Sequence, residues 1–254
     1  MTGLEGSQRP GNHRRHPIHR LVLWNIDLTL IDVARVTRAA YAEAFAAVTG
    51  RPLVQLPQLV GLTEQEIFFD ALGRNGVSLR ADGESERLVA PFSERFAACL
   101  ADREALLSEQ GSLLPGAAEA LRAVAGLEGV VQSVLTGSSR ASAEVKLRAF
   151  GLGEHLDLAI GGFAGSEPYP KGALLRAIRL RAEEKYRSSF ADQLTCYVAD
   201  SPRDVEAARM GGATSVAVAS GRASAAELRE AGADLVLADL TQVGDLIALL
   251  TVTA

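Results

Sequence analysis

Side chains of the kinds that bind phosphate and divalent metals stand at four places along this chain, each after an apolar run. They are Asn25 with Asp27, Thr136 with Gly137, Lys171, and Asp200 with Asp204. Carboxylate and other oxygen ligands suit Mg²⁺, which keeps several waters in proteins. A hydroxyl with backbone N–H groups before a helix binds phosphate oxygens, and a lysine neutralises phosphoryl charge. Together these residue types indicate phosphoryl chemistry assisted by Mg²⁺.

Taken singly, each place has a plainer explanation. In an extended strand Asn25 and Asp27 lie on the same side, but both residue types also cap turns. Ser138 or Ser139 is equally well placed to be a helix N-cap. Lys171 alone is most simply a solvated surface lysine. The case for a shared site therefore depends on the order of the four places and on where the fold puts them.

The elements that must position these residues alternate between strands and helices. Apolar runs predict strands at 21–26, 130–135, 158–160, 195–199, 215–219 and 235–237, and helical spacing marks 117–125, 141–150, 172–185, 202–210 and 223–231. This alternation predicts an α/β fold with a Rossmann-like parallel sheet covered on both faces. The candidate residues then fall at the carboxyl ends of strands, where such sheets bind ligands.

One stretch, from 34 to 110, is helical throughout and interrupts the alternation. We expect an α/β core made of residues 20–33 and 111–254, with 34–110 inserted as a helical cap. The simpler alternative is that these helices pack on the faces of the sheet. Residues 1–19 are rich in Gly, Arg, His and Pro without apolar periodicity, and they are expected to form a disordered tail.

The stretch Asn25-Ile26-Asp27-Leu28-Thr29 resembles the first motif of the haloacid dehalogenase-like (HAD) phosphatases, Asp-x-Asp-x-Thr, with asparagine at the first position. The resemblance extends over about residues 20 to 245. It implies that Asn25 occupies the nucleophile position and that Asp27 is the general acid/base. Thr136, Gly137 and Lys171 would bind the phosphate. Mg²⁺ would be held by a set of four residues, Asn25, Asp27, Asp200 and Asp204.

The cap resembles that of the phosphoglycolate phosphatase and β-phosphoglucomutase branch. In that branch the loop matching Gly61-Leu62-Thr63-Glu64 faces the substrate, which gives Thr63 a substrate-binding role. Lys171 lacks the Lys-Pro-x-Pro context common there. The 34–110 stretch contains no lysine, which argues against the Schiff-base chemistry of the phosphonatases. Asp27 favours phosphoryl transfer over dehalogenation.

Asn25 is the main departure from the family pattern, and its effect is the same whether the change is natural or engineered. An uncharged amide oxygen is a poor nucleophile, and the loss of one negative ligand weakens Mg²⁺ binding. We therefore expect a Mg²⁺-dependent phosphoric monoester hydrolase for a small phosphorylated metabolite, inactive or impaired as written. The alternatives are a non-catalytic phosphate-ligand binding or regulatory protein on the same fold, and a phosphomutase.

Composition limits the other classes of function. The chain has 254 residues and a net charge of −5, without the basic excess of a nucleic-acid-binding protein. No apolar run approaches the roughly 20 residues needed to cross a membrane. Cys99 and Cys196 are far apart in sequence, which favours a reduced, cytoplasmic protein over a disulfide scaffold. We expect a monomer or a homodimer whose partner is a small molecule.

Overall fold

In the computed structural model, six parallel strands form one sheet in the order β5-β4-β1-β6-β7-β8. The structure describes residues 20–57, 61–77, 84–165 and 170–251, and the tail expected at 1–19 lies outside them. The strands are β1 (Arg20–Trp24), β4 (Val130–Ser139), β5 (Gly162–Ala164), β6 (Thr195–Ala199), β7 (Thr214–Val218) and β8 (Leu235–Leu237). The α/β class predicted from the sequence is confirmed.

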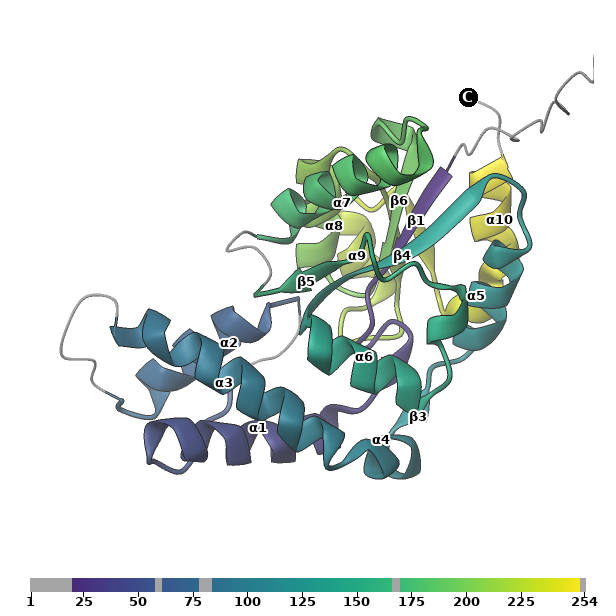
Figure 1. Ribbon diagram of the computed structural model, residues 1–254. Helices are drawn as coiled ribbons and strands as arrows, with labels where there is room; N and C mark the ends of the chain where they lie inside the picture. Colours follow the sequence, from purple (N-terminus) through teal and green to yellow (C-terminus); the bar gives the residue numbers. More distant parts are fainter. Residues whose placement is uncertain (1–19, 58–60, 78–83, 166–169, 252–254) are drawn as a thin grey trace, which may run out of the picture.

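The central strand β1 is apolar along its whole length because both of its faces are covered. Leu21 and Leu23 pack in one apolar cluster, and Val22 and Trp24 pack in the other. The first cluster includes side chains from α7 (Lys171–Tyr186) and α8 (Pro202–Gly211), and the second those from α5 (Ala117–Ala125), α6 (Arg140–Ala149) and α10 (Val243–Thr251). Figure 1 shows these two layers of helices on either side of the sheet.

The remaining helices of the α/β core are short and lie around the sheet. They are α9 (Ala225–Glu230), and the single-turn helices Gly153–His155, Asp192–Leu194 and Leu240–Gln242. The strand expected at 158–160 is wrong. That segment is a turn, in which the Asp157 carboxylate accepts a hydrogen bond from the N–H of Ala159. The edge strand begins only at Gly162, where a Cβ would lie 2.6 Å from a methyl group of Ile178.

The inserted stretch forms a helical cap of α1 (Ala34–Thr49), α2 (Glu64–Arg74), α3 (Glu84–Ala101) and α4 (Glu104–Gln110). The short strands β2 (Ile31–Asp32) and β3 (Ser112–Leu113) pair antiparallel, so the chain leaves the core and returns to it at one place. Figure 1 shows the four helices gathered beyond one end of the sheet. Their shared interior is aromatic, made of Tyr41, Phe45, Phe68, Phe92 and Phe96.

The cap is held against the core at two places. Helices α3 and α4 pack on α6, and Arg148 of α6 forms an ion pair with Glu104 of α4 at 2.7 Å. The loop before α2 lies against the end of β4, because a Cβ on Gly137 would come within 2.2 Å of the Leu62 carbonyl oxygen. Only glycine allows this close approach of two backbones. None of the helices in the described part of the chain is long and apolar enough to cross a membrane.

Candidate active site

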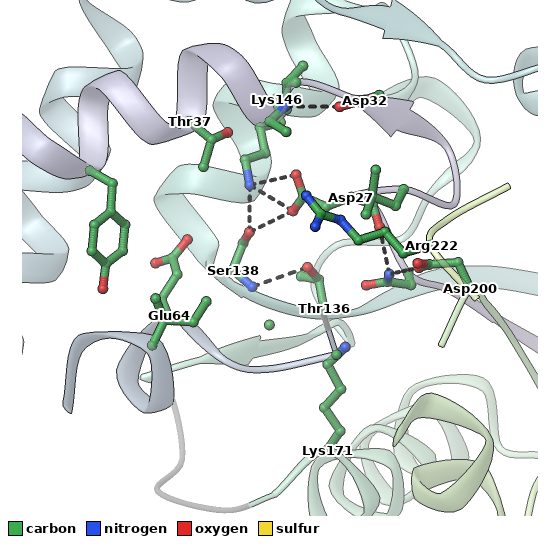
Figure 2. Close-up of a pocket in the computed structure, with 18 of the residues that line it drawn as sticks. Asp27, Asp32, Thr37, Glu64, Thr136, Ser138, Lys146, Lys171, Asp200 and Arg222 are labelled. Atoms are coloured by element: carbon green, nitrogen blue, oxygen red, sulfur yellow. Dashed lines mark hydrogen bonds and ion pairs between the residues drawn. The ribbon is translucent and has the colours of Figure 1, made fainter. Parts of the chain in front are cut away.

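A cavity lies between the carboxyl end of the sheet and the cap. The core side of its wall includes Asn25, Asp27, Thr136, Gly137, Ser138, Lys146, Lys171, Asp200 and Arg222, and the cap side includes Thr37, Tyr41, Gly61, Glu64, Ile67 and Phe96. Six of the eight residues predicted from the sequence therefore meet in one place, and Figure 2 labels Asp27, Thr136, Lys171 and Asp200 among them. The other two, Thr63 and Asp204, do not line this cavity.

The strand register explains why residues so distant in sequence meet. Trp24, the last residue of β1, pairs with Val134 of β4 and with Val198 of β6. The residues that follow each of these three positions by one or two places therefore lie at the same edge of the sheet. Those residues include Asn25 and Asp200, together with Thr136. The candidate residues are thus aligned by backbone pairing.

Asn25 lies just beyond β1, and its side-chain amide forms hydrogen bonds with the end of its own loop and with the loop that follows β6. Its nitrogen donates hydrogen bonds to the Asp27 carbonyl oxygen at 2.9 Å, to Asp200 Oδ1 at 3.0 Å and to Thr29 Oγ1 at 3.2 Å. Thr29 in turn donates to Asp200 Oδ1 at 2.9 Å. Because the Asp27 carbonyl and the Asp200 carboxylate only accept hydrogen bonds, the amide nitrogen is the atom that faces them.

Oxygen atoms of the kind that Mg²⁺ prefers converge on this amide. The Asp27 carbonyl oxygen and Asp200 Oδ1 both point at one atom, the Asn25 amide nitrogen. Asp200 Oδ2 is buried without a hydrogen-bond partner. Within the described residues, no three His, Cys, Asp or Glu side chains are grouped around a metal position. Asp27 could hold such an ion through its backbone carbonyl and Asp200 through its carboxylate, and Asn25 could join them if its amide oxygen took the place of the nitrogen that now faces them.

The ionised Asp200 carboxylate lowers the stability of the folded state, because it is buried. Burial, and secondarily the Asp204 charge, raise the pKa of the Asp200 carboxyl to about 6, although hydrogen bonds from Thr29 and Asn25 and the charge of Lys171 oppose the shift. Since an unfolded aspartate ionises near pH 4, the folded state holds more protons than the unfolded state between about pH 4 and pH 6. The folded protein therefore loses stability as the pH rises through that window.

We predict that Asp200→Asn stabilises the protein at pH 7 by at most about 3 kcal/mol, because it removes a buried charge while keeping an oxygen for Thr29 and Asn25. The gain should vanish near pH 4, where Asp200 is protonated in both states. Thermal or urea unfolding of both proteins at pH 4 and pH 7, without divalent ions, measures this. A variant destabilised equally at both pH values would contradict the prediction.

Asp27 is fixed by a lysine that the sequence analysis did not select. Lys146 Nζ of α6 lies 2.7 and 3.0 Å from the two Asp27 carboxylate oxygens and donates to Ser138 Oγ at 2.9 Å (Figure 2). The Lys146 side chain is 3% exposed. A signal was present in the sequence, since Lys146 falls on the buried face of α6, four residues after the buried Ser142. A lysine at such a position needs a buried partner.

Lys171 and Asp204 form a second buried ion pair beneath the cavity. Lys171 Nζ donates to Asp204 Oδ1 at 2.7 Å, and the Asp204 carboxylate also accepts from Tyr197 OH and Ser201 Oγ. Asp204 was expected among the metal ligands. In this structure its oxygens accept hydrogen bonds from these three donors, so it positions Lys171. Lys171 begins α7, as expected, and lines the cavity.

The hydroxyl of Thr136 is buried in the cavity wall, where its Oγ1 accepts the N–H of Ser138 at 3.1 Å. Thr63, which was expected to contact the substrate, is the N-cap residue of α2. Its side chain caps α2 by accepting the N–H of Glu66, and the Glu66 carboxylate bonds back to the N–H and hydroxyl of Thr63. This capping box turns Thr63 away, so the next residue, Glu64, lines the cavity.

Comparison with known proteins agrees with this arrangement. Residues 22–209 match the family described as haloacid dehalogenase-like hydrolase, while no curated protein matches the chain. Similar solved structures include a predicted phosphoglycolate phosphatase from Haemophilus somnus 129PT (17% identity, 91% of this chain and 99% of that one, TM-score 0.65). A predicted phosphatase from Clostridium acetobutylicum is 18% identical over 91% of this chain and 99% of that one, with a TM-score of 0.66. CbbY from Rhodobacter sphaeroides, solved in complex with phosphate, is 21% identical over 89% of this chain and 96% of that one, with a TM-score of 0.62.

At these identities the solved structures establish the shared fold alone. The family match is broader, because it spans most of the chain and includes the end of β1, the end of β4 and the Asp200 loop. These are the segments whose side chains line the cavity. By this match, and with the sheet and cap arranged as described, the chain belongs to the haloacid dehalogenase-like hydrolases.

Proposed function

We propose that this cavity is the site of a Mg²⁺-dependent phosphoric monoester hydrolase acting on a small phosphorylated metabolite, with activity impaired because Asn25 stands at the nucleophile position. The observation that carries the proposal is the meeting of Asn25, Asp27, Thr136, Lys171 and Asp200 in one cavity. Each supplies a different function that phosphoryl transfer requires. The family of the chain adds support, since it is a family of hydrolases.

Phosphate binding falls to the core side of the cavity. Lys171 supplies a buried cation, and Thr136 supplies a hydroxyl close to the backbone N–H groups that precede α6. Lysine charge and oriented N–H groups stabilise the anionic oxygens of a phosphoryl group. The cavity is about 90 Å³ in volume, well below the roughly 300–1,000 Å³ of pockets for drug-sized ligands, which favours a small ester.

Proton transfer falls to Asp27. Its carboxylate is half-exposed on the cavity, and Lys146 and Ser138 hold it in one orientation from behind. A carboxyl group fixed in this way is suited to give a proton to the leaving alcohol and to accept one from water. A bound Mg²⁺ would neutralise charge on the phosphoryl oxygens, and Asn25, Asp27 and Asp200 are the residues that would hold it.

A second candidate function is binding without turnover, and one observation favours it. The Asn25 amide nitrogen already hydrogen-bonds the two oxygens that would face a cation. The site is therefore satisfied in part by the protein itself, and a phosphate ligand would meet less negative charge than beside an aspartate. A regulatory or ligand-binding protein on this fold would need no more than this.

The experiment that separates the two candidates is a hydrolysis screen of Asn25→Asp. The variant is assayed with Mg²⁺ against a broad panel of small phosphate esters, with phosphate release as the readout. Hydrolysis of one or more esters, dependent on Mg²⁺ and abolished by a second substitution, Asp27→Asn, supports the hydrolase. If the variant releases no phosphate from any ester, the binding protein becomes the better explanation.

A further inference from the structure

Unpaired polar atoms are concentrated in this one cavity. In the parts of the chain that the structure describes, five buried side-chain atoms have no hydrogen-bond partner: Thr37 Oγ1, Tyr41 OH, both carboxylate oxygens of Glu64, and Asp200 Oδ2. All four residues line the cavity. Because an unpaired buried polar group destabilises the folded state, their collection at one place indicates groups kept for a ligand.

Three of the four residues belong to the cap and lie apart from the phosphate-binding side. Thr37 and Tyr41 are four residues apart on α1, which places them on the same face of that helix. Glu64 is the first residue of α2. Figure 2 shows Thr37 to the left of Lys146 and Glu64 to the left of Ser138, on the side of the view opposite Asp200. These three side chains, Thr37, Tyr41 and Glu64, are called the cap triad below.

The electrostatics place two members of the cap triad, Tyr41 and Glu64, close to one another. Burial raises the pKa of the Glu64 carboxyl, while the Lys146 charge and the nearby polar groups of Ser139 and Ser142 lower it. Burial, and secondarily the Glu64 charge, raise the pKa of the Tyr41 hydroxyl. Tyr41 therefore stays neutral and can donate or accept, and Thr37 can do both as well.

We propose that the cap triad is a subsite for hydroxyl groups, so that the ligand of this cavity is the phosphate ester of a polyhydroxylated carbon chain. The inference rests on the proposed function, because it takes the phosphate to lie on the Lys171 side. Thr37 and Tyr41 each donate to or accept from a ligand hydroxyl, and Glu64 accepts from one. Ile67 and Phe96, which line the same region, provide apolar contact for the carbon atoms between.

Other ligand groups fit the triad less well. An ammonium group would meet the Lys146 charge, which already acts on Glu64 and lies 2.7 Å from Asp27. A carboxylate would be repelled by Glu64 and Asp27. An alkyl chain would leave every member of the triad unpaired and desolvated. A hydroxyl both donates and accepts, and it adds no charge to a region that already holds an ion pair.

The test compares binding of matched esters to the chain as it is, with Asn25 in place. The probes are inorganic phosphate and, for three to six carbons, a straight-chain polyol monophosphate and the alkyl monophosphate of equal length, measured by calorimetry. We expect at least one polyol phosphate to bind about 10-fold or more tightly than its alkyl counterpart, the equivalent of one or more hydrogen bonds. Equal affinities at every length would overturn the proposal.

Two variants assign the preference to the triad. Tyr41→Phe and Thr37→Val remove a hydroxyl with little change of shape, and each should reduce the ratio of polyol to alkyl affinity by about 5-fold or more while leaving phosphate affinity unchanged. The matched control is Tyr186→Phe, whose hydroxyl bonds Asp157 outside the cavity, and which should leave the ratio unchanged. An unchanged ratio in both triad variants would contradict the assignment.

Stability gives an independent readout. Since the Tyr41 hydroxyl is unpaired, Tyr41→Phe should unfold at the same or a higher temperature without ligand, whereas Tyr186→Phe should unfold at a lower one. A lowered midpoint for Tyr41→Phe would mean that its hydroxyl is bonded within the protein, against the proposal. If phosphate binds but polyol and alkyl esters bind alike, the subsite fails alone. If neither phosphate nor any ester binds and Asn25→Asp is inactive, the proposed function fails with it.

Discussion

Replacing Asn25 with aspartate is expected to raise the rate of phosphate-ester hydrolysis by at least about 10⁴-fold. Removing the nucleophile from a hydrolase triad lowers the catalytic rate by a comparable factor. Phosphoryl transfer through a covalent intermediate needs an anionic attacking oxygen, which the Asn25 amide does not provide. Asp27 is not a substitute, because its carboxylate is held toward Lys146 and Ser138.

The decisive measurement is steady-state hydrolysis of an aryl phosphate with Mg²⁺ by both forms, together with Mg²⁺ binding by calorimetry. Asn25→Asp replaces the nitrogen that now donates to Asp200 and to the Asp27 carbonyl with an anionic oxygen. Mg²⁺ affinity should therefore rise along with the rate, because the ion gains a carboxylate ligand. Equal hydrolysis rates would show that Asn25 is not at the nucleophile position or that another group attacks.

Lys171→Met is expected to destabilise the protein by about 3–5 kcal/mol, the usual loss when one partner of a buried ion pair is removed. Lys171 and Asp204 are 7% and 1% exposed, and their charged atoms are 2.7 Å apart. Without Lys171, the Asp204 carboxylate retains only the hydroxyl groups of Tyr197 and Ser201 as side-chain donors. The uncompensated charge also lies close to Asp200, whose pKa it already raises.

The same helix offers a matched control. Lys185 pairs with Asp157 at 2.6 Å, but the Lys185 side chain is 45% exposed. Lys185→Met should cost less than about 1 kcal/mol, because water already screens that charge. Urea unfolding at pH 7 of the two variants and the parent protein gives the comparison. Similar losses for the two lysines would mean that the Lys171 pair is not buried in solution. A double substitution, Lys171→Met with Asp204→Leu, should recover part of the loss.

The sequence by itself determined the class of fold, because strand and helix patterns depend on local spacing. Continuous apolar runs predicted five of the six strands of the sheet near their observed places, and β1 and β6 carry Asn25 and Asp200 at their ends. The helical stretch from 34 to 110 was equally legible. The strand expected at 158–160 was wrong because a short apolar run gives little periodicity, and a turn fixed by Asp157 ends it before an edge strand of only three residues.

The tertiary structure alone decided which side chains of the site form hydrogen bonds and ion pairs with one another. Register between β1, β4 and β6 brings Asn25, Thr136 and Asp200 to one edge, but no local pattern states which neighbours then share a proton or a charge. Asp204 was read as a metal ligand, and only packing of α7 on α8 shows that Lys171 engages it. Lys146 was passed over because its partner, Asp27, lies 119 residues away in the chain.

The cap most clearly separates what the sequence predicted from what the folded structure decided. The sequence identified the loop that approaches the cavity, and a helix-capping rule, Thr63 with Glu66, then decides which of its side chains faces inward. Thr63 is turned to the helix end and Glu64 to the cavity, where it meets Tyr41 and Thr37 from a different helix. Helix and strand patterns arise from neighbours in sequence, whereas the unpaired atoms of a binding site arise from surfaces that meet only when the chain is folded.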